Sequence, residues 1–415
     1  MKKYVYPSDI GGSIAAPASK SAMQRSIAAA LLAEGESLLV NPTFCDDSLA
    51  AMRVAEGLGA KIRKKSDCVL ISGGLKPVTG NLNCGESGLC IRMFTPVAAL
   101  TGKELTMTGE KSLAERPVSA IEEPLRELGA FISSSNGKLP IKISGRLLGG
   151  ATEIDGSMSS QFLTGLLMAL PLCEKDSLLK VRNLKSREYI DLTINILKKF
   201  SVEIDNRGYS EFLIKGNQKF IPGIIDIEGD WSGAAFLLCA GAIAGDISVS
   251  GVSTDSAQPD RGIVTALRKA GADITISSDT IRIRKSQLKG FEFDASECPD
   301  LFPPLAALAV YCKGETVIHG AERLKHKESD RGVTIKTEME KLGAKVALHH
   351  DCMVINNSQI RGAEVESHGD HRIAMMCAVA ALGADSPVAI NGAECVSKSY
   401  NEFFDHIVKL GVTVK

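Results

Sequence analysis

Residues 338–356, EMEKLGAKVALHHDCMVIN, contain a short pattern that decides the fold. Helix-forming residues run up to Leu342, and Gly343 then stands where a helix C-cap takes a left-handed residue. Alternating apolar residues follow on both sides of a polar turn, which predicts a β-hairpin. The segment is therefore expected to form a helix, a glycine cap and two strands.

The same pattern occurs five more times along the chain. The other copies cover residues 54–73, 124–145, 195–216, 266–284 and, cut short by the terminus, 407–415. The cap positions are 68 to 72 residues apart: Gly59, Gly129, Ser201, Gly271, Gly343 and Gly411. So regular a spacing indicates an internal repeat.

A second helix, rich in small and apolar residues, precedes each copy and leads into a short strand. These helices are expected at residues 21–33, 88–100, 160–172, 232–244, 301–312 and 371–382. One repeat cannot bury both of its helices alone, but three repeats around their shared apolar helices could. The sequence therefore predicts an α/β (α+β) protein of two similar three-repeat domains. One spans 19–228, and the other combines 1–18 with 229–415, because the N-terminal strand is expected to pair with the second half.

Composition excludes several classes of protein. The 415 residues include 48 Lys plus Arg and 49 Asp plus Glu, so the basic excess typical of nucleic-acid-binding proteins is lacking. No apolar run is long enough to span a bilayer, and the N-terminus lacks the apolar core of a signal peptide. The 11 cysteines show no zinc spacing, which favours reduced thiols in the cytoplasm.

Cofactor motifs give no support for a bound nucleotide or metal. Neither G-x-x-x-x-G-K-[ST] nor G-x-G-x-x-G occurs between a strand and a helix. His368 and His371 lack a clear third partner at metal spacing. We therefore expect no cofactor and no metal.

The six apolar helices begin with polar residues, in ASKS, GESG, SMSSQ, GDWSG, CPD and HGDHR. Ordinary N-capping explains any one of these starts. Lys20 and Arg25 are different, because the helix macrodipole disfavours cations in the first turns. Further basic residues stand near such starts or in polar breaks, and each alone is weak evidence: Arg116, Lys327, Arg331, His371, Arg372 and Lys398. Together they predict a binding site for a ligand with several negative charges.

These motifs resemble the family of 5-enolpyruvylshikimate-3-phosphate (EPSP) synthases over the whole chain. The matching segments are SKSAMQR, AERPVS, GSMSSQFLTGLLMALP, SREYID, CPDLFP, KESDR, GDHRIAM and CVSKSY. The resemblance implies two domains, each of three β-α-β-α-β-β units, in an inside-out α/β barrel arrangement. It also implies transfer of the enolpyruvyl group of phosphoenolpyruvate to the 5-hydroxyl of shikimate 3-phosphate, with release of phosphate.

The resemblance implies a role for each matching residue. The shikimate 3-phosphate site would comprise Lys20, Ser21, Arg25, Ser159, Ser160, Gln161, Ser186, Tyr189, Asp300 and Lys327. The phosphoenolpyruvate site would comprise Lys20, Gly88, Arg116, Gln161, Arg331, His371, Arg372 and Lys398. The proton-transfer groups would be Asp300 at the hydroxyl and Glu328 at the methylene carbon, with Lys20 sharing in the transfer. These small molecules would be the only partners of a monomeric enzyme.

The segment GESGLCIRMF departs from the family pattern. Family members commonly have Asn-Ala-Gly-Thr there, followed by Arg-Pro, whereas this chain has Glu86, Leu89 and Met93 in place of Asn, Thr and Pro. These changes bear on the affinity for phosphoenolpyruvate and on inhibition by glyphosate, which competes there in the family.

Three other functions are open at this stage. One is the related transfer to UDP-N-acetylglucosamine, although that family favours Lys-Asn where this chain has Lys20-Ser21. RNA 3′-phosphate cyclases share a related repeat, but the near-neutral charge and 5% aromatic content argue against RNA binding. A non-catalytic scaffold is the third, and it would tolerate changes at Lys20, Arg116, Arg331 and Arg372.

Overall fold

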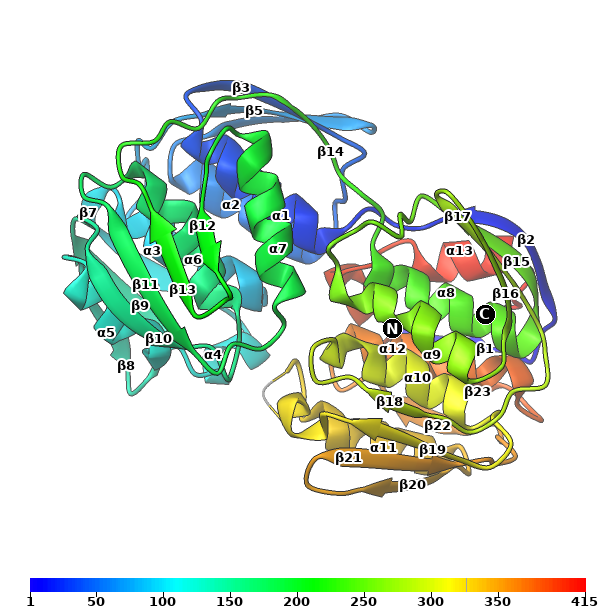
Figure 1. Ribbon diagram of the computed structural model, residues 1–415. Coiled ribbons are helices and arrows are strands. Elements are labelled where there is room, and N and C mark those ends of the chain that lie inside the picture. Colours follow the sequence, from blue (N-terminus) through cyan, green and yellow to red (C-terminus); the bar gives the residue numbers. More distant parts are fainter. Residues whose placement is uncertain (326) are drawn as a thin grey trace. The chain divides into compact units, whose positions relative to one another are not determined.

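The computed structural model describes residues 1–325 and 327–415, which form two compact units (Figure 1). The internal unit is Ala18–Ile227, and the terminal unit combines Met1–Pro17 with Glu228–Lys415. Each unit contains three successive repeats, with helices and strands in the expected order.

In the internal unit the first repeat comprises α1 (Lys20–Leu32), β3 (Gly35–Val40), α2 (Asp46–Gly57), β4 (Lys61–Lys64) and β5 (Cys68–Gly73). The second comprises β6 (Asn81–Asn83), α3 (Gly88–Ala99), β7 (Gly102–Thr108), α4 (Ser112–Glu115), α5 (Glu122–Glu127), β8 (Phe131–Ser135) and β9 (Lys138–Gly145). The third comprises β10 (Ala151–Asp155), α6 (Gln161–Ala169), β11 (Ser177–Arg182), α7 (Glu188–Lys199), β12 (Asp205–Arg207) and β13 (Glu211–Ile214). Strand β14 (Ile224–Asp226) follows.

The terminal unit begins with β1 (Lys2–Val5) and β2 (Ile10–Ala15). The fourth repeat of the chain, which is the first in this unit, comprises α8 (Trp231–Ala244), β15 (Gly245–Ser250), α9 (Ile263–Lys269), β16 (Asp273–Ser277) and β17 (Thr280–Arg284). The fifth comprises β18 (Glu292–Asp294), α10 (Phe302–Ala309), β19 (Glu315–His319), α11 (Arg331–Lys341), β20 (Lys345–Leu348) and β21 (Cys352–Asn356). The sixth comprises β22 (Glu364–Glu366), α12 (His371–Ala380), β23 (Val388–Asn391) and α13 (Phe403–Lys409).

Each repeat forms its own small sheet. In the order β6-β7-β9-β8, the first two strands are parallel and the last three are antiparallel, and β10-β11-β13-β12 and β18-β19-β21-β20 follow the same plan. Over the described residues the strands form six separate sheets and no closed barrel. The fold class predicted from the repeats is therefore confirmed, as a set of small sheets packed on helices.

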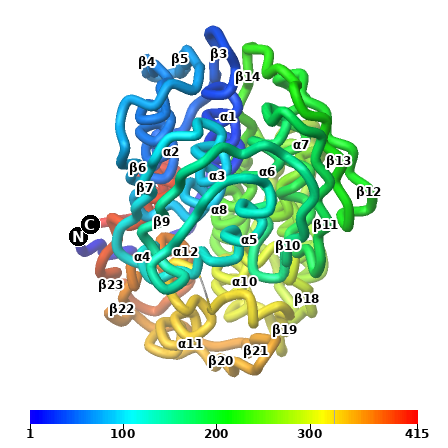
Figure 2. Tube along the Cα trace, turned by 90° about the vertical axis from the view of Figure 1, so that its left-hand side faces the viewer, coloured from blue at the N-terminus to red at the C-terminus, as the bar shows by residue number. Residues whose placement is uncertain are grey.

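Three sheets take a strand from a distant part of the sequence, and in one of them β1 pairs antiparallel with β23. Strand β2 pairs in parallel with β15, so the prediction that the N-terminal strand joins the second half is confirmed. Strand β14 pairs in parallel with β3 and completes the first repeat (Figure 2). The sheets of the first, fourth and sixth repeats thus each include a strand from a distant part of the sequence.

The predicted glycine caps have the expected backbone conformation. The angle φ is +118° at Gly59, +103° at Gly129, +78° at Gly271, +89° at Gly343 and +107° at Gly411. Ser201, the one cap that is not glycine, has φ of +62°. Because all six are left-handed, each helix ends at its cap, and a β-hairpin follows in the first five repeats.

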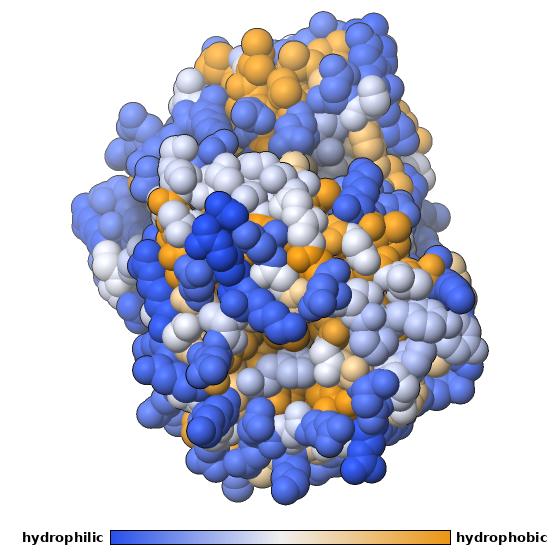
Figure 3. All heavy atoms as spheres, turned by 90° about the vertical axis from the view of Figure 1, so that its right-hand side faces the viewer, coloured by the Kyte–Doolittle hydropathy of each residue, from blue (hydrophilic) through white to orange (hydrophobic). Residues whose placement is uncertain are grey.

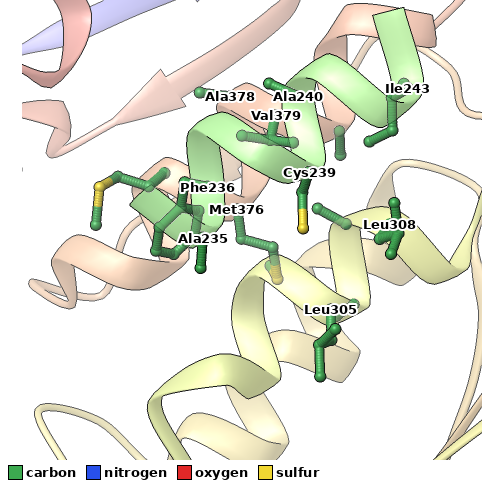
Figure 4. Packing of buried hydrophobic residues seen from close by; sticks show 14 of the residues in the cluster. Ala235, Phe236, Cys239, Ala240, Ile243, Leu305, Leu308, Met376, Ala378 and Val379 are labelled. Atoms are coloured by element: carbon green, nitrogen blue, oxygen red, sulfur yellow. The ribbon is translucent and has the colours of Figure 1, made fainter. Parts of the chain in front are cut away.

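The six apolar helices form the cores. In the terminal unit α8, α10 and α12 lie inside, and the sheets lie outside them (Figure 1). Phe236 and Cys239 of α8, Leu305 and Leu308 of α10 and Met376 of α12 pack together, and all are fully buried (Figure 4). Helices this apolar are covered on every side. Polar side chains that could bind a ligand are therefore expected at their first turns.

The molecular surface is mixed. The face drawn in Figure 3 is mostly hydrophilic, with hydrophobic atoms in several separate areas. Within residues 1–325 and 327–415, none of the helices combines the length and hydrophobicity that a membrane crossing requires.

Candidate active site

In the internal unit, predicted site residues gather at the first turns of α1, α3, α6 and α7. Ser19 caps α1 by accepting from the amide of Ala22, and Ser87 caps α3 by accepting from the amide of Cys90. Ser160 precedes α6, and its neighbour Ser159 accepts from the amide of Gln161 at 3.2 Å. These helix starts present amide groups and the positive ends of helix dipoles, as an anion site requires.

Arg25 is a cation in the core, only 2% exposed. Its Nε donates to Thr193 Oγ1 at 2.9 Å, and its Nη1 donates to the carbonyl of Ser21 at 2.9 Å. The guanidinium also stacks on Tyr189, with its central carbon 5.5 Å from the ring centroid. Burial, opposed by Tyr189, lowers the pKa of Arg25 to about 10. The buried charge of Arg25 therefore faces mainly neutral oxygen atoms, and an anionic ligand would stabilise it.

Lys20 lies at the start of the same helix. Its Nζ is 2.9 Å from Asp47 Oδ2, and both side chains are almost buried, at 12% and 11% exposure. The pair holds the ammonium group at the helix start, where the macrodipole would otherwise disfavour it.

A second group of cations surrounds Gly88, the first residue of α3. A Cβ atom built on Gly88 would lie 2.9 Å from Arg92 Nη1 and 3.0 Å from Arg116 Nη1. Arg92 also donates to Gln161 Oε1 at 3.1 Å, so this glutamine belongs to the same group. Glu86 stands beside it and forms an ion pair with Lys111 at 2.8 Å. The departure from the family pattern at Glu86 is therefore accompanied by a neutralising lysine.

The remaining predicted residues of this unit lie near Arg25. Ser186 is buried in a left-handed conformation with φ of +55°, and its carbonyl accepts from the amide of Tyr189 at 3.1 Å. The carbonyl of Tyr189 in turn accepts from Thr193 Oγ1 at 2.8 Å. This turn joins the SREYID motif to the Arg25 cluster.

In the terminal unit, Asp300 lies among three cations. Its Oδ1 is 3.1 Å from Lys327 Nζ and 2.7 Å from Arg331 Nη1, and its Oδ2 is 3.2 Å from Arg372 Nη2. Burial alone would raise the pKa of Asp300, but Arg372, Lys327 and Arg331 together hold it well below its ordinary value. Burial lowers the pKa of Lys327, although Asp300 opposes that effect. These cations therefore favour the ionised form of Asp300.

Arg331 connects Asp300 to two further carboxylates. Its Nε donates to Asp370 Oδ2 at 2.9 Å, and its Nη2 donates to Glu328. The sequence places Lys327 four residues before Arg331, but α11 begins only at Arg331, so Lys327 and Glu328 lie in the segment before the helix. They nevertheless reach the same cluster as Arg331.

The segment before α12 joins the other predicted cations. Asp370 caps α12, and Lys398 Nζ donates to the carbonyl of Gly369 at 2.7 Å. His371 Nε2 lies 2.7 Å from Arg372 Nη1. Lys398 ends a short 3-10 helix (Ala393–Lys398), and its side chain is buried rather than on the surface.

The structure therefore groups the predicted residues within each unit. It also adds partners that the sequence did not single out, which are Asp47, Arg92, Thr193, Ser232, Asp260 and Asp370. Asp370 stands inside the HGDHR motif, directly before two predicted site residues, and this position in the sequence could have identified it as a site residue. The described residues contain no group of three or more His, Cys, Asp or Glu that could hold a metal ion.

Comparisons with known proteins identify the family. The family model for EPSP synthase (3-phosphoshikimate 1-carboxyvinyltransferase) matches residues 5–407. The chain belongs to the EPSP synthase family. The 3-phosphoshikimate 1-carboxyvinyltransferase of Clostridium kluyveri is 40% identical, with 99% of this chain and 97% of that protein covered. That of Methanocorpusculum labreanum is 37% identical over the full length of both chains.

Solved structures agree with membership of the EPSP synthase family. The structure of EPSP synthase from Acinetobacter baumannii has a TM-score of 0.85 and 28% identity, covering 100% of this chain and 99% of that one. The enolpyruvyl transferase NikO from Streptomyces tendae, at 15% identity and a TM-score of 0.81, shares the fold. The chain is thus an enzyme of the EPSP synthase family, and the amino-sugar and RNA alternatives are not favoured.

Proposed function

We propose that this chain transfers the enolpyruvyl group of phosphoenolpyruvate to the 5-hydroxyl of shikimate 3-phosphate and releases phosphate. The observation that carries the proposal is Asp300, a partly buried carboxylate in direct contact with Lys327, Arg331 and Arg372. A carboxylate that can transfer a proton thus lies in the same cluster as cations that can bind an anionic substrate. Family membership supplies the substrates.

Shikimate 3-phosphate is assigned to the cluster around Arg25. The guanidinium of Arg25 suits its carboxylate, and the hydroxyls of Ser21, Ser159, Ser160 and Ser186 are donors for its phosphate and ring oxygens. The rest of the proposed site is Lys20, Gln161, Tyr189, Asp300 and Lys327. The proposal is supported by the burial of Arg25 against neutral oxygen partners.

Phosphoenolpyruvate is assigned to the cations around Gly88 and around Asp300. Its proposed partners are Lys20, Gly88, Arg116, Gln161, Arg331, His371, Arg372 and Lys398. Gly88 lets backbone amides at the start of α3 approach the ligand, since the space of its missing Cβ is bordered by Arg92 and Arg116. The departures at Glu86, Leu89 and Met93 are proposed to alter affinity here, not the reaction.

The chemistry is an addition followed by an elimination. Asp300 takes the proton of the 5-hydroxyl, the hydroxyl oxygen bonds to C2 of phosphoenolpyruvate, and Glu328 protonates C3. In the second step Glu328 removes a proton from C3, the double bond re-forms and the bond from C2 to the phosphate oxygen breaks. Lys20 assists proton transfer at the departing group. The two carboxylates exchange acid and base roles between the steps, as general acid–base catalysis permits.

The cations also control the basicity of Asp300. They hold the pKa of Asp300 low, which makes it a weak base. Substrate anions compete for Arg331 and Arg372, so the pKa of Asp300 rises when the site fills. The same cations stabilise negative charge as it develops on the phosphate.

We further propose that the two compact units are the two three-repeat domains and that the enzyme acts as a cytoplasmic monomer. All 11 cysteines are free thiols, which supports a reducing compartment. Sedimentation analysis of the purified protein measures its mass in solution, and a value of 44.1 kDa would support the monomer.

Phosphate release tests the proposed function. The purified protein is mixed with both substrates, and each is omitted in turn. Release that requires both supports the transferase, and Asp300→Asn and Glu328→Gln are then expected to lower kcat by about 100-fold or more. Asp246→Asn, which changes an exposed carboxylate, is the matched control. A folded protein that releases no phosphate would contradict the proposal, and UDP-N-acetylglucosamine would then replace shikimate 3-phosphate.

A further inference from the structure

Asp260 is a buried carboxyl group that the proposed reaction does not use. It lies in the 3-10 helix η3 (Pro259–Gly262), before α9, and is 1% exposed. Its carboxylate accepts a hydrogen bond from the hydroxyl of Ser232, near the start of α8. Arg372 Nη2 donates to the same hydroxyl oxygen at 3.3 Å and lies 3.2 Å from Asp300 Oδ2. A chain of contacts therefore runs from Asp260 through Ser232 and Arg372 to Asp300.

We propose that Asp260 is a positioning residue that holds Arg372 through Ser232 and thereby tunes the affinity for phosphoenolpyruvate. The inference rests on the proposed function, because Arg372 is there assigned to this substrate. Asp260 itself does not touch the reacting atoms.

The segment that carries Asp260 is fixed to the start of α8. Gln258 Nε2 donates to the carbonyl of Gly229 at 2.8 Å, and Gln258 Oε1 accepts from the amide of Trp231 at 3.0 Å. Gln258 is itself buried, at 3% exposure. Because these bonds lie on both sides of the α8 start, the carboxylate of Asp260 has a fixed direction toward Ser232.

The charge of Asp260 adds a second effect. The groups that face it are Asp300, Arg372, Asp230 and the Ser232 hydroxyl. Burial, followed by the negative charge of Asp300, raises the pKa of Asp260 to about 7, while Ser232 and Arg372 act in the opposite direction. Asp260 is therefore mostly neutral below pH 7 and mostly negative above it. A negative charge behind Arg372 weakens the attraction of that arginine for a substrate anion.

Two variants separate the geometric effect from the charge effect. Asp260→Asn keeps an oxygen that accepts from Ser232 but has no charge, whereas Ser232→Ala removes the link to Arg372. The first quantity to compare is the ratio of two KM values for phosphoenolpyruvate, that of the parent divided by that of Asp260→Asn. We expect this ratio to rise about fivefold from pH 6 to pH 8, because only the parent gains a negative charge behind Arg372. Ser232→Ala should raise this KM about tenfold at both pH values. The KM for shikimate 3-phosphate should change less than twofold in either variant.

The comparison with the parent removes the titration of the substrate. A phosphate monoester has a second pKa near 6, so the affinity for phosphoenolpyruvate depends on pH in every variant. That dependence cancels in the ratio. Arg261→Gln changes the exposed neighbour of Asp260 and is the matched control, with both KM values unchanged.

Thermal unfolding gives a readout that needs no activity. A carboxyl whose pKa is raised on folding destabilises the native state above its unfolded pKa, with the full cost reached above its folded pKa. The gain in Tm of Asp260→Asn over the parent should therefore grow between pH 5 and pH 8. A KM ratio that stays flat with pH, or a Tm difference that stays flat, would overturn the inference. A parent that releases no phosphate would instead overturn the proposed function, and the Tm comparison would still decide on the charge of Asp260.

Discussion

Arg331 and Asp370 are joined by two hydrogen bonds, from Nε at 2.9 Å and from Nη2 at 3.3 Å, and neither side chain is exposed to solvent. The same carboxylate accepts from the backbone amide of Arg372 at 3.0 Å and so caps α12. One aspartate therefore fixes an arginine of α11 and the start of the helix that carries the next arginine.

Asp370→Asn should destabilise the protein strongly. The substitution keeps the size of the side chain but leaves Arg331 with less negative charge around it, and breaking a buried ion pair costs about 3 kcal/mol. Urea unfolding of the ligand-free protein measures the loss. The matched control is Asp246→Asn, whose partner Arg282 is half exposed, and its cost should be much smaller because solvent screens an exposed ion pair. Equal losses in the two variants would contradict the prediction.

Arg25→Met should abolish binding of shikimate 3-phosphate without lowering the stability of the ligand-free protein. Folding lowers the pKa of Arg25 to about 10, so keeping it charged destabilises the native state at every pH below that value, and stability would recover only as the pH rises above it. At pH 7 the methionine variant should therefore have a Tm equal to or above that of the parent. The rise in Tm on adding shikimate 3-phosphate should disappear, while Arg25→Lys should keep part of it. A variant that unfolds at much lower temperature would show that Arg25 stabilises the core.

Gly88→Ala should raise the KM for phosphoenolpyruvate about tenfold. The new methyl group would lie within 3.0 Å of the terminal nitrogens of Arg92 and Arg116, so at least one guanidinium must move. The KM for shikimate 3-phosphate should change little. Gly223→Ala is the matched control, because no atom lies within 4 Å of the added Cβ there. Steady-state kinetics with each substrate varied in turn provides the measurement.

Lys111→Gln should raise the KM for phosphoenolpyruvate by about twofold to fivefold. The substitution removes the positive charge that lies 2.8 Å from Glu86, so the carboxylate repels the substrate anion more strongly. Because Lys111 is 77% exposed, added salt should reduce the difference from the parent. The double variant with Glu86→Gln should return to the parental value. An unchanged KM in Lys111→Gln at low salt would count against a role for Glu86 near this substrate.

Local rules were sufficient for much of the fold. The cap positions and apolar helices follow from residue pattern alone, and even Ser201 has the left-handed conformation that its place in the repeat demands. The pairing of β14 with β3 did not follow, because a three-residue strand gives no signal of its partner. The cations of the site were visible from their place at helix starts. The carboxylate partner Asp47 was not, nor was Asp260, which reaches Arg372 through Ser232, since these contacts depend on tertiary packing rather than on spacing.

The pairing of β2 with β15 has a consequence for how the chain is made. Residues 10–15 leave the ribosome early, yet their partner at residues 245–250 is synthesised much later. The internal unit, by contrast, has all its strands once β14 has emerged. We therefore expect the internal unit to fold during translation, while the first strands wait, unpaired, for the second half. A nascent chain arrested once residue 227 has left the ribosome should accordingly protect the internal unit from protease and leave its first 17 residues open to cleavage.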